Sequence, residues 1–399
     1  MDHPLKISLP PEMNSPEVKA IFRILGKGNV RFVGGCVRNA LMGLSTRDVD
    51  LATPLLPRNV TERLLKNKVK VVPTGLAHGT VTAVINGKLF EITTLRIDKK
   101  TDGRHAKVVF SGSWEEDAAR RDFTMNALYA DLDGVVYDPL GRGVLDLDKK
   151  RVVFVGDPET RIREDYLRIL RFFRFSLYYG GGKLDCAGLA ACQKLSRGLS
   201  QLSKERVTQE FFKILSHSKA EKILGSMCGI GILKSLFVKS FDSRRLGTLV
   251  SLQKGGVDDV LLMARLVLVS GSLVKIDKWL ILNRKQKSFF EKLAVLRINT
   301  IRIETSKIHS WVYYDGPEIA LARLQLAYAA GRLSAADYKK FMALVSEPVP
   351  PFPVKAKDLM ALGYRGAALG EAIKKLEKKW IGAEFKLERG ALLSRVSPT

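Results

Sequence analysis

Two aspartates separated by one residue, Asp48 and Asp50, are the first side chains in this sequence that could do chemistry. Residues two apart on a strand point to the same face, so a strand through Val49 would direct both carboxylates to one site. Two adjacent anions repel each other unless a cation lies between them, and carboxylate oxygens suit Mg²⁺. The pair predicts a divalent-metal site, and a solvated strand edge is the simpler alternative.

A glycine pair lies shortly before these aspartates. Gly34 and Gly35 follow a predicted strand at 30–33 and open a short helix that carries Arg38. Backbone N–H groups at such a turn could approach a phosphate, and Arg38 would add a donor fork. The alternative is that the two glycines form an ordinary turn with no role in binding. The combination of this turn with the aspartate pair, with a strand on each side, favours nucleotidyl transfer.

A third carboxylate, Glu91, alternates with apolar residues on a predicted interior strand at 89–95. It is a candidate third ligand of the metal. The alternative is an edge-facing glutamate that pairs with Lys88 or Arg96.

Further along, two strings follow these motifs in order: RRDFTMNA at 120–127 and EDYLRILRFFRF at 164–175. With the glycine turn and the aspartate pair, they resemble the class II tRNA nucleotidyltransferase and bacterial poly(A) polymerase family. The resemblance is strongest over about residues 28–215, including SKERVTQE at 203–210, which is similar to the family's neck motif. KDLMALG at 357–363 looks like the tail of bacterial members.

The resemblance implies a role for each matching residue. Asp48 and Asp50 would hold two Mg²⁺ ions, which activate the tRNA 3′-hydroxyl and steady the leaving pyrophosphate. The nucleotide would be bound by Gly34, Gly35, Arg38, Arg121, Asp122 and Asn126. A carboxylate at Asp122 that accepts from the ribose 2′-hydroxyl would reject deoxynucleotides. Alternatively, 120–121 is an exposed basic turn and Asp122 is an N-cap.

Charged side chains recur about every third residue on a helix predicted over 163–179: Asp165, Arg168, Arg171 and Arg174. An aspartate and an arginine one turn apart offer an acceptor and a donor to a base edge. Adenine and cytosine both present an amino donor beside a ring acceptor, whereas guanine and uracil present the reverse. Asp165 and Arg168 would therefore accept ATP and CTP and reject GTP and UTP. An ordinary ion pair on a solvated helix face is the alternative, and the other two arginines suit base stacking or phosphate contact.

The chain departs from the family at two places, of which the looser is a glycine run at 180–182 that ends the base-reading helix. At the other place, it has Asn39 where the family usually has Asp. An amide still forms local hydrogen bonds, so a structural role would survive, whereas a role that needs negative charge would not.

Several activities share these motifs. The long polar loop at 96–105 resembles full CCA-adding enzymes and favours CCA addition, and the segment at 74–80 looks like the same group. Poly(A) synthesis is the main alternative, and CC-only or A-only addition also stays open. A catalytically silent RNA-binding protein is disfavoured because every acidic and base-reading position is present.

The pattern of strands and helices expected around these residues indicates an α+β protein. A mixed-sheet, polymerase-β-like nucleotidyltransferase head at 1–150 precedes an all-helical remainder: a neck at 151–220, a body at 221–347 and a tail at 348–399. Asn86-Gly87 predicts a two-residue hairpin between strands at 80–85 and 89–95. Helices are also expected at 16–25, 204–216, 258–269, 317–331, 335–345 and 370–380.

Composition identifies the expected partners. The 399 residues carry 66 Lys and Arg against 41 Asp and Glu, a net charge of +25, which predicts a polyanionic partner, here the tRNA acceptor end. The longest apolar stretch, at 261–274, is too short for a membrane span. Four cysteines without metal-ligand spacing and an N-terminus without an export signal predict a cytoplasmic protein, and no obligate protein partner is evident.

Overall fold

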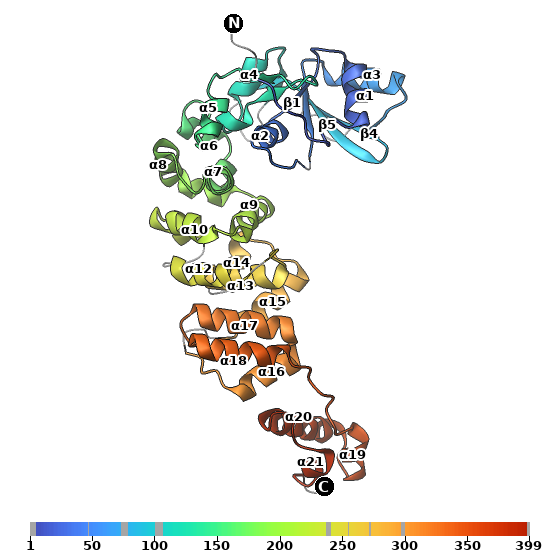
Figure 1. Cartoon of the computed structure of the whole chain (residues 1–399), viewed down its shortest axis with the longest axis vertical. Coiled ribbons are helices and arrows are strands. Elements are labelled where there is room, and N and C mark those ends of the chain that lie inside the picture. Colours follow the sequence, from blue (N-terminus) through green and yellow to red (C-terminus); the bar gives the residue numbers. More distant parts are fainter. Residues whose placement is uncertain are drawn as a thin grey trace. The chain divides into compact units, whose positions relative to one another are not determined.

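The computed structural model describes residues 5–46, 48–72, 79–99, 107–236, 241–253, 255–270, 273–296 and 300–396. The chain forms two compact units, Met1–Leu202 and Ser203–Thr399. The first unit contains the sheet and the first helices, and the second is built from helices, as Figure 1 shows. The predicted fold class, a mixed-sheet head followed by a helical remainder, is confirmed.

The sheet of the first unit has the strand order β3-β4-β5-β2-β1-β8-β9. Its strands are β1 (Arg31–Val33), β2 (Asp50–Thr53), β3 (Lys70–Val72), β4 (Thr80–Ile85), β5 (Lys88–Thr94), β8 (Tyr129–Ala130) and β9 (Val136–Tyr137). Within it, β2 and β5 run parallel and the other neighbouring strands run antiparallel. Two further strands, β6 (Arg96–Lys99) and β7 (Lys107–Phe110), form a separate ladder.

Local sequence signals fix several boundaries. The hairpin between β4 and β5 turns at Asn86 and Gly87, whose φ angles of 51° and 75° match the left-handed turn that this dipeptide favours. Ser15 accepts a hydrogen bond from the Val18 N–H and caps α1 (Pro16–Leu25), which ends at Gly26 with φ 94°.

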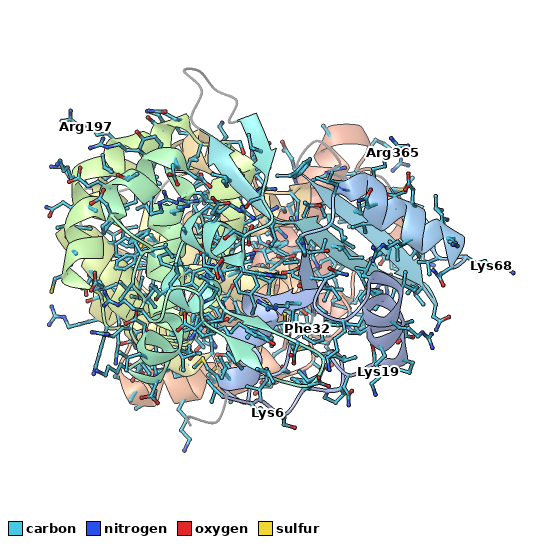
Figure 2. The ribbon with its side chains drawn as sticks, turned by 90° about the horizontal axis from the view of Figure 1, so that it is seen from above. Lys6, Lys19, Phe32, Lys68, Arg197 and Arg365 are labelled. Carbon is cyan, nitrogen blue, oxygen red and sulfur yellow. The ribbon has the colours of Figure 1, made fainter. Side chains whose placement is uncertain are left out.

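The other helices of the first unit follow the strands. They are α2 (Gly35–Leu41), α3 (Pro57–Lys66), α4 (Trp114–Ala119), α5 (Gly143–Asp148), α6 (Pro158–Glu164), α7 (Leu167–Tyr178) and α8 (Cys186–Leu195), with short 3₁₀ turns at Thr124–Asn126 and Ser196–Gln201. Figure 2 shows Lys19 on α1 and Lys68 after α3 pointing outward, whereas Phe32 of β1 lies inside and is fully buried.

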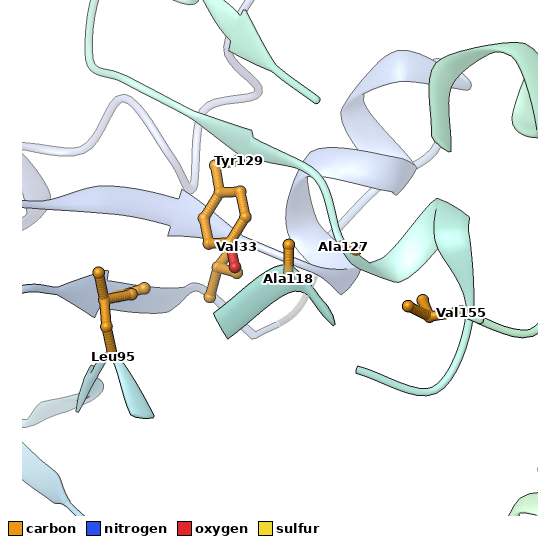
Figure 3. Packing of buried hydrophobic residues seen from close by; sticks show 7 residues of the cluster. Val33, Leu95, Ala118, Ala127, Tyr129 and Val155 are labelled. Carbon is orange, nitrogen blue, oxygen red and sulfur yellow. The ribbon is translucent and has the colours of Figure 1, made fainter. Parts of the chain in front are cut away.

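A small buried hydrophobic cluster lies in the first unit and contacts the polar side chains of the candidate site. It joins strands to helix α4 through Val33, Ala52, Leu95, Ala118, Ala127, Tyr129 and Val155, six of which are labelled in Figure 3. Tyr129 is fully buried, yet its hydroxyl donates to Asp117 at 2.7 Å. The cluster therefore ties the apolar core directly to the polar network described below.

The second unit has thirteen helices within its described residues. These are α9 (Lys204–Ser216), α10 (Ala220–Gly229), α11 (Ile232–Leu236), α12 (Ser243–Leu252), α13 (Asp259–Ser270), α14 (Leu273–Trp279), α15 (Arg284–Ala294), α16 (Thr305–Asp315), α17 (Pro317–Ala329), α18 (Ala335–Ser346), α19 (Ala356–Ala361), α20 (Gly366–Gly382) and α21 (Arg389–Leu393). Trp380 of α20 is the largest side chain in a buried cluster with Leu359, Leu376 and Leu392.

The structure differs from the predicted elements at one important place. The helix predicted over 163–179 is two helices, because α6 ends at Glu164 and α7 begins at Leu167. The division of the helical part into neck, body and tail stays a prediction. In the loop predicted at 96–105, Arg96–Lys99 forms β6, and the rest of that loop and most of the segment at 74–80 lie outside the described residues. Among the described residues, no helix is long and apolar enough to cross a membrane.

Candidate nucleotide and metal site

Three carboxylates meet at the edge of the sheet where β2 begins. Asp50 is the first residue of β2, and in the parallel pairing with β5 it lies opposite Glu91. Asp48 precedes the strand, so the expectation that both aspartates lie on one strand is wrong for Asp48. All three nevertheless line the same open cleft of about 920 Å³, together with Lys88 and Phe90.

Charge repulsion is built into this edge. Partial loss of hydration, and then the negative charges of Glu91 and Asp48, raise the pKa of Asp50 above its ordinary value, against the opposing charge of Arg121. Lys88 does not relieve the repulsion by pairing with Glu91 as the alternative had it, because its ammonium lies 3.3 Å from Glu17.

The donor chemistry fits Mg²⁺, which is bound through one or two carboxylates together with substrate phosphates. Within the described part of the chain, no three acidic, histidine or cysteine side chains are arranged to hold a metal by themselves. Asp48 and Asp50 would therefore share the ion with oxygens of the nucleotide.

The glycine turn lies beside this acidic edge. Gly34 has φ 69° and precedes α2, and an added Cβ would lie 3.4 Å from both Nη1 of Arg121 and the carbonyl oxygen of Asn126. A side chain at Gly34 would touch these groups at ordinary contact distance, and it is the positive φ that favours glycine at this position.

Arg38 is buried and nearly saturated with hydrogen bonds. Its Nε and Nη2 both donate to Oδ1 of Asn39, at 3.2 and 2.9 Å. Nη1 donates to Oδ1 of Asn126 at 2.5 Å, and Nη2 also donates to the hydroxyl of Tyr179 at 2.7 Å. Four of its five N–H groups are thus used, so the expected free donor fork is wrong for this arrangement. Asn39 has the structural role that an amide can fill, since its Nδ2 also donates to the Ser45 carbonyl at 3.2 Å.

Arg120 and Arg121 do not form an exposed basic turn. Both pair with Asp117, at 2.7 and 2.8 Å, and Asp117 is almost fully buried. Burial acts to raise the pKa of Asp117, but the charges of Arg121 and Arg120 hold that pKa below its ordinary value. Nη1 of Arg121 has no acceptor among the described residues and faces the turn at Gly34, which leaves it available to a phosphate.

Asp122 connects this turn to α7. Its Oδ1 accepts from the Phe123 N–H at 2.8 Å and from Asn126 at 3.0 Å, and its Oδ2 accepts from Nε of Arg171 at 2.7 Å. Nη2 of Arg171 adds a contact at 2.6 Å. The carboxylate does not cap the following 3₁₀ turn, whose N-cap is Phe123. A ribose hydroxyl could bond Asp122 only by replacing one of these donors.

The two base-reading candidates lie at the break between α6 and α7. Asp165 follows α6, and its Oδ1 accepts from the Leu167 N–H at 3.1 Å at the start of α7. Arg168 lies on the first turn of α7 and donates to Glu164 at 2.6 Å and to the Arg161 carbonyl at 2.9 Å. The predicted single stripe is therefore wrong for Asp165, although both side chains remain close in sequence and partly exposed.

Positive charge gathers around one aromatic ring of α7. The guanidinium carbons of Arg174, Arg171 and Arg38 lie 4.2, 4.9 and 5.2 Å from the centroid of Phe175. Ring faces attract cations, so Phe175 holds three arginines together that would otherwise repel one another.

Sequence reasoning missed two members of this site. Asp117 is spaced three and four residues before Arg120 and Arg121, a helical ion-pair pattern that could have identified it. Tyr179 lies 141 residues from Arg38. No local pattern indicates that contact.

Comparisons with known proteins show which families and chains this sequence is similar to. The "Poly A polymerase head domain" family model matches residues 30–153, and the model described as "Probable RNA and SrmB- binding site of polymerase A" matches residues 183–243. The mouse (Mus musculus) protein "CCA tRNA nucleotidyltransferase 1, mitochondrial" is 31% identical, with 97% of this chain and 93% of the mouse chain covered.

Two solved structures have the same fold. The CCA-adding enzyme of Bacillus stearothermophilus in complex with CTP superposes with a TM-score of 0.71 at 25% identity, covering 96% of this chain and 98% of that one. The Thermotoga maritima CCA-adding enzyme complexed with tRNA has the same TM-score at 20% identity, covering 99% and 98%.

Proposed function

The chain belongs to the CCA tRNA nucleotidyltransferase family, and we propose that it adds CCA to the 3′ end of tRNA from CTP and ATP without a nucleic-acid template. The observation that carries this proposal is the acidic edge of Asp48, Asp50 and Glu91 next to Arg121 and the glycine turn. Carboxylates for metal and a basic pocket for phosphates are the two requirements of nucleotidyl transfer.

Asp48 and Asp50 would hold two Mg²⁺ ions, and Glu91 is the candidate third ligand. When bound, the ions lower the pKa of the tRNA 3′-hydroxyl and neutralise the charge on the leaving pyrophosphate. The protein would supply carboxylates at the start of β2 and just before it, so the reacting groups would need little reorganisation.

The nucleotide would lie between the glycine turn and α7. Nη1 of Arg121 and the backbone at Gly34 and Gly35 would contact the triphosphate, with Arg38 behind them as a support. Asn126 and Asp122 would border the ribose, and a 2′-hydroxyl that replaces one donor at Asp122 would favour ribonucleotides.

Base selection would come from Asp165 and Arg168. Arg168 is held by Glu164 and the Arg161 carbonyl, which orients a donor. Asp165 would accept from the amino group that adenine and cytosine share. Arg171 and Arg174 would contact phosphate or stack on the base.

The second unit would bind the tRNA acceptor end. Residues 203–399 carry 34 Lys and Arg against 18 Asp and Glu, a net charge of +16. Phosphate and shape contacts suit such a surface better than base reading. We place the enzyme in the cytoplasm, although the mouse relative is named as mitochondrial.

Incorporation assays test this proposal against its alternatives. With Mg²⁺ and a tRNA that lacks its 3′ CCA, we expect labelled CTP and ATP both to be incorporated. Incorporation of ATP should require that CTP has been incorporated first. Incorporation of ATP alone without limit would support poly(A) synthesis, CTP alone would support CC-only addition, and ATP alone limited to one residue on tRNA ending in CC would support A-only addition. No incorporation with intact tRNA binding would indicate a binding protein.

A further inference from the structure

Tyr179, the residue immediately after α7, has no assigned role in the proposed reaction. Its hydroxyl accepts from Nη2 of Arg38 at 2.7 Å and lies 3.4 Å from Oδ1 of Asn39. Its ring also lies beneath Arg38, with the guanidinium carbon 3.9 Å from the ring centroid. Tyr179 therefore holds Arg38 by two different interactions, a hydrogen bond and a cation–π contact.

Arg38 depends on such support because its acceptors are uncharged. All four of its hydrogen bonds within the described part of the chain go to amide or hydroxyl oxygens, on Asn39, Asn126 and Tyr179. A buried guanidinium without a carboxylate partner is expensive unless its N–H groups are satisfied. Losing one acceptor would leave a buried donor unpaired.

The same network reaches α7 at a second point. From Arg38 it continues through Asn126 to Asp122, and from Asp122 to Arg171. Arg171 and Tyr179 are eight residues apart, about 12 Å along a helix. Helix α7 is thus linked to α2 through Tyr179, just after the helix ends, and to residues 122–126 through Arg171, near the middle of the helix.

We propose that Tyr179 is a positioning residue for nucleotide binding. It fixes Arg38 and, through Arg38, the position of α7 relative to the triphosphate-binding turn at Gly34 and Gly35. This inference rests on the proposed function. Because the triphosphate is common to ATP and CTP, the effect of Tyr179 is the same for both nucleotides. Base discrimination, which belongs to the start of α7, is untouched.

Two substitutions separate the two interactions of Tyr179. Tyr179→Phe removes the hydroxyl and keeps the ring, whereas Tyr179→Leu removes both. The adjacent Tyr178→Phe is the matched control, because it removes a hydroxyl from a more exposed ring on the same helix end. Steady-state kcat and KM for CTP and ATP, the ATP-to-GTP ratio of kcat/KM, and Tm are measured for each protein.

We expect Tyr179→Phe to raise KM about tenfold for both nucleotides, the effect of losing a hydrogen bond to a charged group, with kcat within about threefold of wild type. Tyr179→Leu raises KM further, and Tyr178→Phe matches wild type. The ATP-to-GTP ratio stays constant throughout. A lowered Tm with unchanged KM would overturn the proposal, as would a KM effect confined to one nucleotide.

A double substitution tests whether Tyr179 acts through Arg38. Asn39→Asp places a carboxylate next to Arg38, which would then hold the guanidinium without the hydroxyl of Tyr179. We expect Tyr179→Phe to raise KM less than about threefold in the Asn39→Asp background, since an ion pair between the guanidinium and a carboxylate would hold Arg38 more strongly than its present bonds to an amide oxygen. An equal rise in both backgrounds would contradict a role through Arg38. If wild type itself incorporates neither nucleotide, the proposed function fails, whereas an active wild type with an indifferent Tyr179 refutes only this inference.

Discussion

The residues at the acidic edge combine a proposed role in metal binding with an electrostatic cost. Asp50 and Glu91 are opposed on parallel strands, and Asp48 is near enough to raise the pKa of Asp50 further. The charge of Arg121 opposes this rise in pKa without reversing it. The arrangement makes sense if a metal ion enters with the substrate.

Removal of either aspartate should abolish catalysis and spare tRNA binding. We expect Asp48→Ala and Asp50→Ala each to lower incorporation of CTP and ATP by about 100-fold or more, because each removes a metal ligand. Affinity for tRNA should barely change on a protein of charge +25. Asp133→Ala, at an exposed pair with Lys27, is the control and should be neutral. Near-normal turnover of either site variant with Mg²⁺ would show that the metal lies elsewhere.

Glu91 should contribute to the pH dependence of the site, after the burial of Asp50. Its charge raises the pKa of Asp50, so Glu91→Gln should lower that pKa and let Asp50 stay ionised at lower pH. The acid limb of the kcat/KM profile at fixed Mg²⁺ should therefore move to lower pH, whatever happens to the maximal rate. An acid limb that stays in place would mean that Asp50 does not control it.

At the scale of elements, the strongly patterned segments could be predicted from sequence. The strand at 80–85, the Asn86-Gly87 turn and the helix at 204–216 lie where they were predicted, since their turn and cap signals are local, and the strand predicted at 89–95 begins and ends one residue earlier. The break before α7 could not be predicted, because the three-residue spacing of charged side chains continues across it. The contact between Arg38 and Tyr179 is set by tertiary packing of α2 against α7, which no local signal encodes.

The break before α7 sharpens the test of base reading. Asp165→Asn keeps an oxygen for the Leu167 N–H but adds a donor where the base edge needs an acceptor. We expect the preference for ATP over GTP to fall by about 1–3 kcal/mol, with Tm nearly unchanged. Asp165→Ala should also lose the hydrogen bond from the Leu167 N–H and about 1 kcal/mol of stability. Measuring kcat/KM for all four triphosphates shows whether Asp165 reads the base. An equal fall in kcat/KM for all four, with the preference for ATP over GTP unchanged, would remove the support for base reading.

At the scale of the whole molecule, the charge of the second unit predicts salt-sensitive binding of tRNA. Each phosphate contact contributes about 0.7–0.9 to the slope of log affinity against log salt. Lys374→Gln with Lys375→Gln, on the exposed face of α20, should reduce that slope, whereas Lys66→Gln with Lys68→Gln near α3 should not. Filter binding over a salt series measures both. Affinity that is flat between low and moderate salt would exclude this surface as the main tRNA platform.

The sequence of the nucleotides added to one tRNA shows whether the enzyme adds CCA. A transcript that lacks its last three residues is incubated with the enzyme, Mg²⁺ and all four triphosphates, and its 3′ ends are sequenced. We expect C, C and A in that order, with extension ending at the A, and no addition by Asp50→Ala. A homopolymeric A tail, or products that contain G and U as often as C and A, would contradict it.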